Sequence, residues 1–361
     1  MNTSVWPLIL AGIENFVLIN ALLSVAAFGV AAFARTNKHI RAWHPLSLSR
    51  LYAAALILPP AISAWVVSAS LLPAAWIGTD RWVQEHQSPH TLHLLNALTF
   101  PLDPLLGYVA LSFALLALMI AAYAGASAYF RVDHVVRRLE IDAEPPAPDR
   151  VKQVEDACRR HGINVGLVMS HYPFSFVWGY LRSKLVISTG LLNTLTREEL
   201  SALLEHEAAH HARRDNLSKW VLTICRYASP AFPLTGLLYR WWAEQVEMIC
   251  DEIAALRTKA PVDVAGALAR LKRLTLATLP HRPQSGESRF FGEHGESFER
   301  RVTRVLSLPD QPEASGASSL SRSWMKVAAM AGAAFVLSLI ALFLVSPLAI
   351  HRAVEFILYA F

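Results

Sequence analysis

Four long apolar runs constrain what this chain can fold into more than any other feature of its sequence. They occupy residues 5–34, 51–77, 104–130 and 325–349. A helix needs about 20 apolar residues to cross a hydrocarbon core of roughly 30 Å, and each run is long enough. With 54% hydrophobic and 17% charged residues, the chain is also more apolar than a typical soluble domain. The sequence therefore predicts a mainly α membrane protein with four transmembrane helices.

Basic residues near the ends of these runs indicate how they are oriented. They gather between the first two runs and after the third: Arg35, Lys38, Arg41, Arg50, Arg131, Arg137 and Arg138. The loop at 78–103 has only Arg81. Because loops rich in arginine and lysine stay in the cytoplasm, we expect an external N-terminus and a cytoplasmic region at 131–323. The first run lacks the pattern of a cleaved signal peptide, so it is expected to remain as an anchor.

The chain accordingly divides into five expected parts. These are a three-span region at 1–130, a cytoplasmic domain at 131–308, a flexible linker at 309–323, a fourth transmembrane helix at 324–350 and a short external tail at 351–361. Within the cytoplasmic domain, the pattern predicts a helix at 149–160, a strand at 164–170 and two strands within 174–188. A longer helix should follow at 197–213, which makes the domain α+β.

The stretch EHEAAHHARRD at 205–215 is the densest group of chemically active side chains. It lies in the predicted helix at 197–213, which should begin with a capping box formed by Thr196 and Glu199. His206 and His210 are four residues apart and therefore share one face of that helix. In an H-E-x-x-H helix the two imidazoles converge on one zinc ion. Glu207, which lies between them, is then the candidate general base.

A catalytic zinc ion normally takes three protein ligands, so a third ligand has to come from elsewhere in the chain. The stretch AEQVEMICDEIAA at 243–255 contains Glu247 and, four residues later on the same helical face, Asp251. Glu247 suits the third ligand. Asp251 suits an acceptor for the outer N–H of an imidazole, which would set its tautomer. Glu244 is the competing third ligand.

Each of these stretches alone is also compatible with the solvated face of a surface helix. The two together favour a metal site. His211 projects about 100° away from His210 and is expected to be a surface histidine. Arg213, Arg214 and Asp215 are expected to end the helix and meet lipid headgroups. Basic residues lie beside apolar runs rather than in a separate tract, so direct nucleic-acid binding is not expected.

The segment between the two half-sites, residues 217–242, is apolar enough to resemble a transmembrane helix. A single crossing would place Glu247 on the opposite side of the membrane from His206, which a shared metal forbids. We therefore predict a helical hairpin that lies on or dips into the inner leaflet. An ordinary buried helix pair is the alternative. The tryptophans expected to anchor the hairpin at the interface are Trp220, Trp241 and Trp242.

Several segments resemble the integral-membrane zinc metallopeptidases of the beta-lactam sensor-transducer type, BlaR and MecR. They are FVWGYLRSKLVIS, LTREELSALLEHEAAHHARRDN, the apolar connector with its tryptophans and prolines, and EMICDEIAA. Three spans before the peptidase region and one after it are also similar, so the likeness covers most of residues 1–350. It implies a gluzincin-like zinc peptidase domain inserted between helices 3 and 4, facing the cytoplasm of a bacterium from its inner membrane. In some members it also implies cleavage of a transcriptional repressor.

A more distant likeness is to the membrane peptidases of the CAAX-prenyl and heat-shock type, which share HExxH and a later Glu-x-x-x-Asp. The stretch HGESFERRV, which begins at His294, is similar to a downstream His and Arg-containing helix of those enzymes. This similarity implies that His294 stabilises the transition state, and the alternative is an ordinary histidine of a flexible loop. Only about ten residues follow the last span, where the sensor members carry a penicillin-binding domain, so beta-lactam sensing is not expected.

The expected activity is zinc-dependent endoproteolysis of a cytoplasmic or membrane-proximal protein. The expected partners are the lipid bilayer and a protein or peptide substrate, with a repressor protein among the candidates. Two alternatives stay open: a proteolytically inactive zinc-binding sensor or scaffold, and a processing or quality-control protease of the CAAX and heat-shock type. A transporter would rest on Glu14, Asn15 and Asn20, which either mark a transport path or make contacts between helices. It would also need internal repeats, which the sequence does not show.

Overall fold

In the computed structural model of this chain, residues 6–77, 145–180, 183–278 and 295–308 are described, with a few positions between 112 and 123. The elements are α1 (Trp6–Thr36), α2 (Lys38–Arg41), α3 (Pro45–Ile77), α7 (Pro148–His161), β1 (Asn164–Val168), β2 (Ser175–Trp178), β3 (Lys184–Ser188), α8 (Thr189–Thr194), α9 (Arg197–Arg213), α10 (Asp215–Ala228), α11 (Phe232–Thr258), α12 (Pro261–Thr278) and α13 (Gly295–Leu306). The expected linker, external tail and fourth span lie outside the described residues, as does the third span apart from those few positions.

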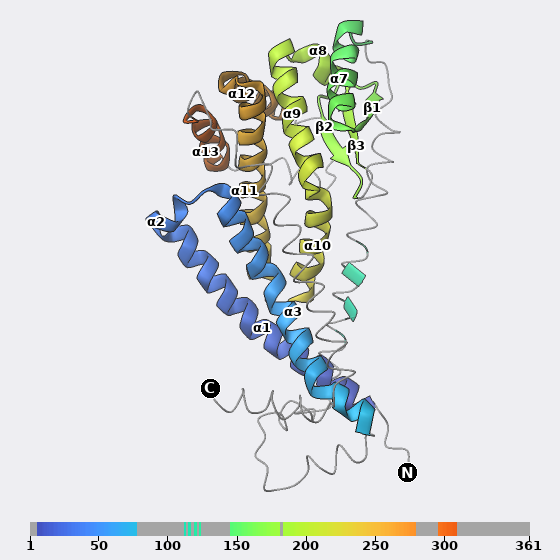
Figure 1. Ribbon diagram of the computed structural model, residues 1–361, viewed down its shortest axis with the longest axis vertical. Helices are drawn as coiled ribbons and strands as arrows, with labels where there is room; N and C mark the ends of the chain where they lie inside the picture. The colour runs from blue at the N-terminus through green and yellow to red at the C-terminus, as the bar shows by residue number, and fades with distance from the viewer. Residues whose placement is uncertain are drawn as a thin grey trace.

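Two helices form a long antiparallel pair that extends away from the rest of the fold (Figure 1). Within α1 and α3, the segments Gly12–Thr36 and Pro45–Ser68 are long and apolar enough to cross a membrane. The short helix α2 joins them, and the Asn37 side chain caps it by accepting hydrogen bonds from two backbone N–H groups. Many large apolar side chains of the pair are exposed, including Leu22 at 73%. This arrangement suits two transmembrane helices.

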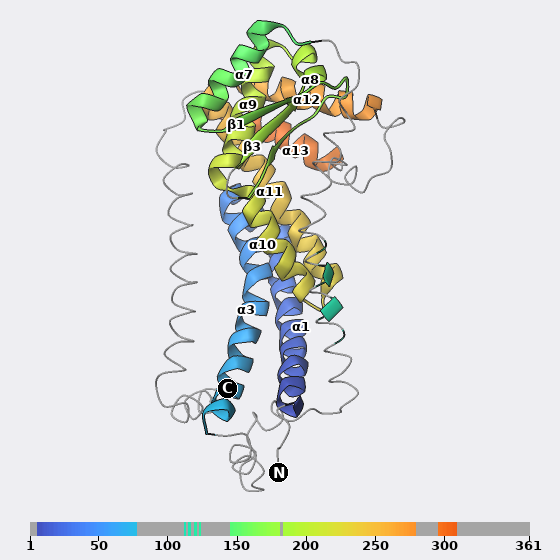
Figure 2. The ribbon, with the colours of Figure 1, turned by 90° about the vertical axis from the view of Figure 1, so that its right-hand side faces the viewer.

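A small three-stranded sheet lies at the other end of the molecule (Figure 2). Its order is β1-β3-β2, in which β1 is parallel and β2 antiparallel to β3. The strand expected at 164–170 ends earlier, at Val168, because the Ser170 carbonyl accepts a hydrogen bond from the Gly190 N–H. A Cβ atom at position 190 would lie 2.3 Å from the His171 carbonyl oxygen, so only glycine allows this approach. The strand β2 is left at one edge of the sheet.

The helix α9 has the predicted bounds of 197–213. The Thr196 hydroxyl accepts from the Glu199 N–H and the Glu199 carboxylate accepts from the Thr196 N–H, so the predicted capping box is present. One side of α9 packs with α7, α8 and β3 around a core that includes Leu200 and Leu204. Its other side contacts α11 and α12. The helix therefore lies in the middle of the domain.

Residues 217–242 fold as the two arms of a helical hairpin, α10 and α11, joined by a turn at 229–231. Both arms run alongside α3 (Figure 2). The second arm does not stop at residue 242 but continues as one helix to Thr258. The second arm of the hairpin and the segment that carries Glu247 therefore belong to a single helix. The core around it includes Trp242 and Val246 of α11 and Tyr52 of α3.

The polar residues of the first apolar run are buried between helices. Glu14, Asn15 and Asn20 are each no more than 5% exposed. The Asn20 side chain donates a hydrogen bond to the carbonyl of Ala228, at the end of α10. For Asn20, the structure therefore agrees with the expectation of a contact between helices.

Candidate metal centre

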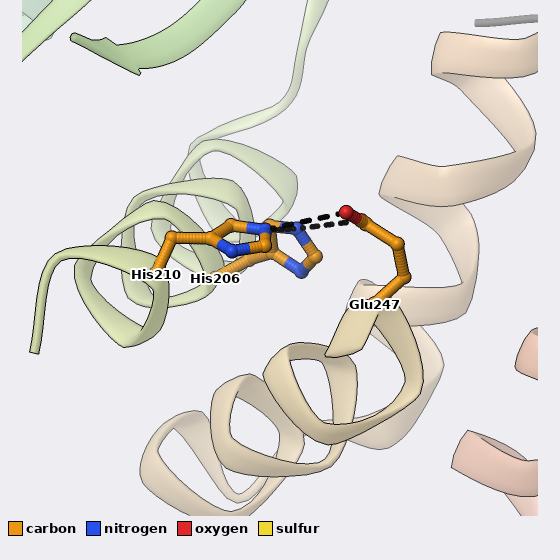
Figure 3. A group of neighbouring side chains, drawn as sticks. All are labelled: His206, His210 and Glu247. Carbon is orange, nitrogen blue, oxygen red and sulfur yellow. Dashed lines mark hydrogen bonds and ion pairs between the residues drawn. The ribbon is translucent and has the colours of Figure 1, made fainter. Parts of the chain in front are cut away.

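Three metal-binding side chains from two helices meet at one point (Figure 3). His206 and His210 come from α9, and Glu247 comes from α11. The two Nε2 atoms are 3.1 Å apart. Glu247 Oε2 lies 3.5 Å from Nε2 of His206, and Glu247 Oε1 lies 3.6 Å from Nε2 of His210. The structure thus brings together the three ligands predicted from the sequence.

These separations fit a tetrahedral zinc ion. Ligand atoms at about 2.0–2.1 Å from zinc in tetrahedral geometry lie about 3.4 Å from one another. Two imidazole lone pairs at 3.1 Å would also repel one another unless a proton or a cation lay between them. The donor set of two nitrogens and one carboxylate leaves a fourth position open, as in catalytic rather than structural zinc sites. The Glu247 side chain is 31% exposed, so the site is open on that side.

The Nδ1 atom of each histidine, which faces away from the site, contacts a carboxylate. His206 Nδ1 lies 2.9 Å from Asp251 Oδ1, and His210 Nδ1 lies 2.8 Å from Asp215 Oδ2. An ionised carboxylate only accepts hydrogen bonds, so each Nδ1 carries the proton and each Nε2 lone pair faces the site. Asp251 therefore has the position expected for it. The expectation that Asp215 meets lipid headgroups is wrong, because Asp215 is only 2% exposed.

Two arginines hold these carboxylates in turn. Arg301 of α13 places Nε 2.6 Å from Asp251 Oδ2 and a terminal nitrogen 3.0 Å from Asp251 Oδ1. The same terminal nitrogen lies 3.6 Å from Glu247. Arg213 donates to both oxygens of Asp215, and so it also turns inward rather than toward headgroups. Arg301 was not identified from the sequence, although it lies in the stretch HGESFERRV.

The carboxylates of the centre are held in their ionised form. Burial acts to raise the pKa of Glu247, but His210, His206 and Arg301 lower it well below its ordinary value. Burial likewise acts to raise the pKa of Asp251, and Arg301 and His206 lower it. A negatively charged ligand set of this kind favours a divalent cation.

In the metal-free protein, the pKa values of the two imidazoles are shifted upward, opposite to those of the carboxylates. Burial acts to lower the pKa of His206, but Asp251 and Glu247 raise it above the usual value. Burial likewise acts to lower the pKa of His210, but Cys250, Glu247 and Asp215 raise it well above the usual value.

A cysteine lies beside the centre and was not singled out from the sequence. Cys250 Sγ is 3.4 Å from His210 Nδ1 and 3.6 Å from Asp215 Oδ2. Burial raises the pKa of this thiol to about 11, so it is neutral at physiological pH. With His210 and Asp215 it forms a second group of potential metal ligands. That group uses the outer nitrogen of His210, which already faces Asp215.

Glu207 lies between the two histidines in sequence and is 7% exposed. Its carboxylate accepts a 2.7 Å hydrogen bond from the Ser175 hydroxyl of β2. The candidate general base is therefore tied to the edge strand of the sheet. This contact joins segments that are far apart in the chain, and it was not anticipated from the sequence.

The remaining candidates lie elsewhere. Glu244, the competing ligand, binds Arg35 at 3.1 Å and Arg300 at 3.5 Å and is not part of the group of three. His211 is also outside that group. His294 lies outside the described residues. The group of three can thus hold one cation and is open on the side of Glu247.

Comparison with known proteins agrees with this chemistry. A family model described as BlaR1 peptidase M56 matches residues 29–277. The matched part begins in α1, ends in α12 and includes every residue of the centre except Arg301. No solved structure matches the chain.

Proposed function

The chain belongs to the BlaR1 peptidase M56 family, which makes it a membrane-associated metallopeptidase, and we propose that it is a zinc-dependent endopeptidase acting at the cytoplasmic face of the membrane. The observation that carries this proposal is the triangle of His206, His210 and Glu247, with Glu207 on the same helix as the two histidines. A zinc site that only stabilises a fold needs no general base. The intact Glu207 therefore argues against an inactive sensor or scaffold.

In this proposal His206, His210 and Glu247 hold the ion. A bound zinc ion supplies Lewis acidity, which polarises the scissile carbonyl and acidifies the attacking water. Glu207 accepts the proton of that water and passes it to the leaving amine. The Ser175 hydroxyl, at 2.7 Å, holds the carboxylate of Glu207 in one orientation. Asp251, together with Arg301, keeps the His206 ring aligned.

The edge strand β2 is the proposed substrate-binding strand. The Ser188 N–H donates to the Phe174 carbonyl, so in this antiparallel pair the backbone groups of Ser175 and Val177 point away from β3. The Asn216 side chain already donates to the Val177 carbonyl at 2.6 Å. An extended substrate that adds to this edge would pass Ser175, whose hydroxyl contacts the base. Backbone recognition of this kind gives limited sequence preference.

The proposed orientation follows from the basic residues at the α1–α3 connection, which keep that end of the helices in the cytoplasm. The metal centre lies at the same end of the pair (Figure 1). Proteins of the cytoplasm and of the membrane surface are therefore the proposed substrates. By its resemblance to sensor-transducers, a transcriptional repressor in a signalling pathway is one candidate.

The experiment that tests this function compares three forms of the full chain in lipid nanodiscs with an unstructured casein as substrate. Wild type should contain one zinc ion per chain and cleave casein. Glu207→Gln should keep the zinc and lose at least about 100-fold in cleavage rate, because only the base is removed. His206→Ala should lose both. Cleavage that persists in zinc-loaded Glu207→Gln would remove the role assigned to Glu207.

A further inference from the structure

The tip of the α10–α11 hairpin is fastened to α1 inside its candidate membrane span. Asn20 donates to the Ala228 carbonyl at 2.9 Å, and its side-chain oxygen accepts from the Ser24 hydroxyl at 3.1 Å. The Ser229 hydroxyl then lies 2.8 Å from that of Ser24. Ser24, Ser229 and Asn20 are at most 1% exposed. Hydrogen bonds between buried polar groups fix where the turn lies along α1.

A second contact fixes the other end of the same pairing. Near the end of α1, Arg35 forms an ion pair with Glu244 of α11 at 3.1 Å, and its guanidinium lies 4.9 Å from the centre of the Trp241 ring. Trp241 also stacks on Phe28 of α1. Arg35 begins the basic connection to α3, and basic residues and tryptophans of this kind mark the membrane–water interface. Glu244 therefore lies at the level of the membrane surface.

The two contacts agree on the depth of the hairpin. They are separated by roughly 15 residues on α1 and by a similar number on the hairpin, which is about 22 Å at 1.5 Å per residue. Half of the hydrocarbon core is about 15 Å. A tip about 22 Å below the level of Arg35 reaches at least the middle of the bilayer. Glu247, three residues beyond Glu244, is only about 4.5 Å further from the membrane.

The outer surface of the hairpin suits lipid. Its large apolar side chains are exposed to 37–40%: Trp220, Val221, Phe232 and Leu237. They continue the exposed apolar surface of the two candidate spans, where Leu22, Val25 and Leu58 are exposed to 52–73%. In a bilayer, acyl chains would cover both surfaces together. Lipid is therefore the occupant to which this surface is suited.

We infer that the hairpin is a re-entrant element, that the metal centre lies at the membrane surface, and that its preferred substrates are protein segments tethered to the bilayer. A scissile bond within a few residues of a membrane anchor would reach a centre about one helical turn above the interface without the anchor leaving the lipid. A tether also raises the local concentration of the substrate. This substrate class rests on the proposed peptidase function, whereas the depth of the hairpin does not.

The depth is tested by fluorescence quenching in bilayers that contain lipids brominated deep in the acyl chain. A bimane label is placed at Phe232→Cys at the tip, at Leu22→Cys on α1 near Asn20, and at Phe33→Cys near Arg35. All three are made with Cys225→Ala, because the other two native cysteines are buried. The tip label should be quenched like position 22 and more than position 33. A tip label quenched like position 33, or less, overturns the re-entrant hairpin.

The substrate class is tested in nanodiscs with one casein fragment in two forms, one free and one fused to a single transmembrane helix. Wild type should cleave the tethered form at least about tenfold faster, at sites close to the anchor, and Glu207→Gln should cleave neither. Equal rates for both forms would overturn the tethered class and leave the peptidase function standing. A zinc-loaded wild type that cleaves neither form would overturn the proposed function itself, and the quenching result would be unaffected.

Discussion

The individual residues of the metal centre differ in how visible they are in the sequence. His206, Glu207 and His210 follow from a local pattern on one helix, because a spacing of four residues places both rings on one face. Asp215 could not be found in this way. It is the second residue after α9 ends, and it reaches back to His210 because Arg214 takes a left-handed conformation with φ of 55°.

Glu247 belongs to the group of three candidate ligands and Glu244 does not, so substitution of each should affect zinc binding differently. Glu247→Ala removes one of three ligands and should abolish stoichiometric zinc binding at micromolar zinc, while Glu244→Ala removes only the contacts with Arg35 and Arg300. Zinc content after dialysis against a weak chelator measures this. Full zinc content in Glu247→Ala would show that another residue completes the site. Loss of zinc in Glu244→Ala would show that Glu244 takes part in binding it.

The pKa shifts of the histidines predict how pH affects the thermal stabilisation of the protein by zinc. The pKa values of His206 and His210 are raised in the metal-free protein, so their charged forms add stability below about pH 6.5. This contribution is lost as pH rises through the raised values. Zinc requires neutral imidazoles, so its binding competes with those protons. The difference in Tm between zinc-loaded and metal-free protein should therefore widen from pH 6 to pH 8. A constant or shrinking difference would contradict the assignment of these ligands.

At the scale of elements, local signals predicted the bounds of α9 and the presence of the strands. The capping box marks where α9 begins, and alternating or β-branched residues mark the strands. The continuity of α11 from the hairpin to Thr258 was not anticipated, since the sequence was divided into a connector and a ligand helix. Arg301 also escaped prediction, because its contact with Asp251 joins residues fifty positions apart. Such pairings depend on how helices pack.

The link between α10 and the edge strand gives a prediction at the same scale. Asn216→Ala removes hydrogen bonds from its side chain to the carbonyls of Val177 and Gly179. The two bonds together contribute about 1–3 kcal/mol, so cleavage should fall about 5- to 150-fold. The fall should appear in KM more than in kcat, with zinc content unchanged, because β2 binds substrate in this account. Steady-state kinetics with casein in nanodiscs would show this. A loss confined to kcat would place Asn216 in another role.

At the scale of the whole molecule, α11 connects the membrane helices to the rest of the domain. Its acids contact basic residues on both sides: Glu244 contacts Arg35 and Arg300, and Glu252 contacts His44 and Arg304. The proposed ligand Glu247 and its neighbour Asp251 lie between these two acids on the same helix. The position of the metal centre is therefore coupled to that of α1 and α3. Composition and charge pattern predicted the membrane character but not these side-chain contacts between helices.

The other predictions depend on one zinc ion being held by His206, His210 and Glu247. Zinc-edge X-ray absorption of the purified full-length protein tests it most directly, because zinc–nitrogen and zinc–oxygen distances of about 2.0–2.1 Å differ from a zinc–sulfur distance of about 2.3 Å. We expect one zinc ion per chain, two imidazole ligands, further oxygen ligands and no sulfur. A sulfur ligand would instead assign the metal to the group of His210, Asp215 and Cys250. That result, or a protein that binds no zinc, would show that His206, His210 and Glu247 do not form the zinc site.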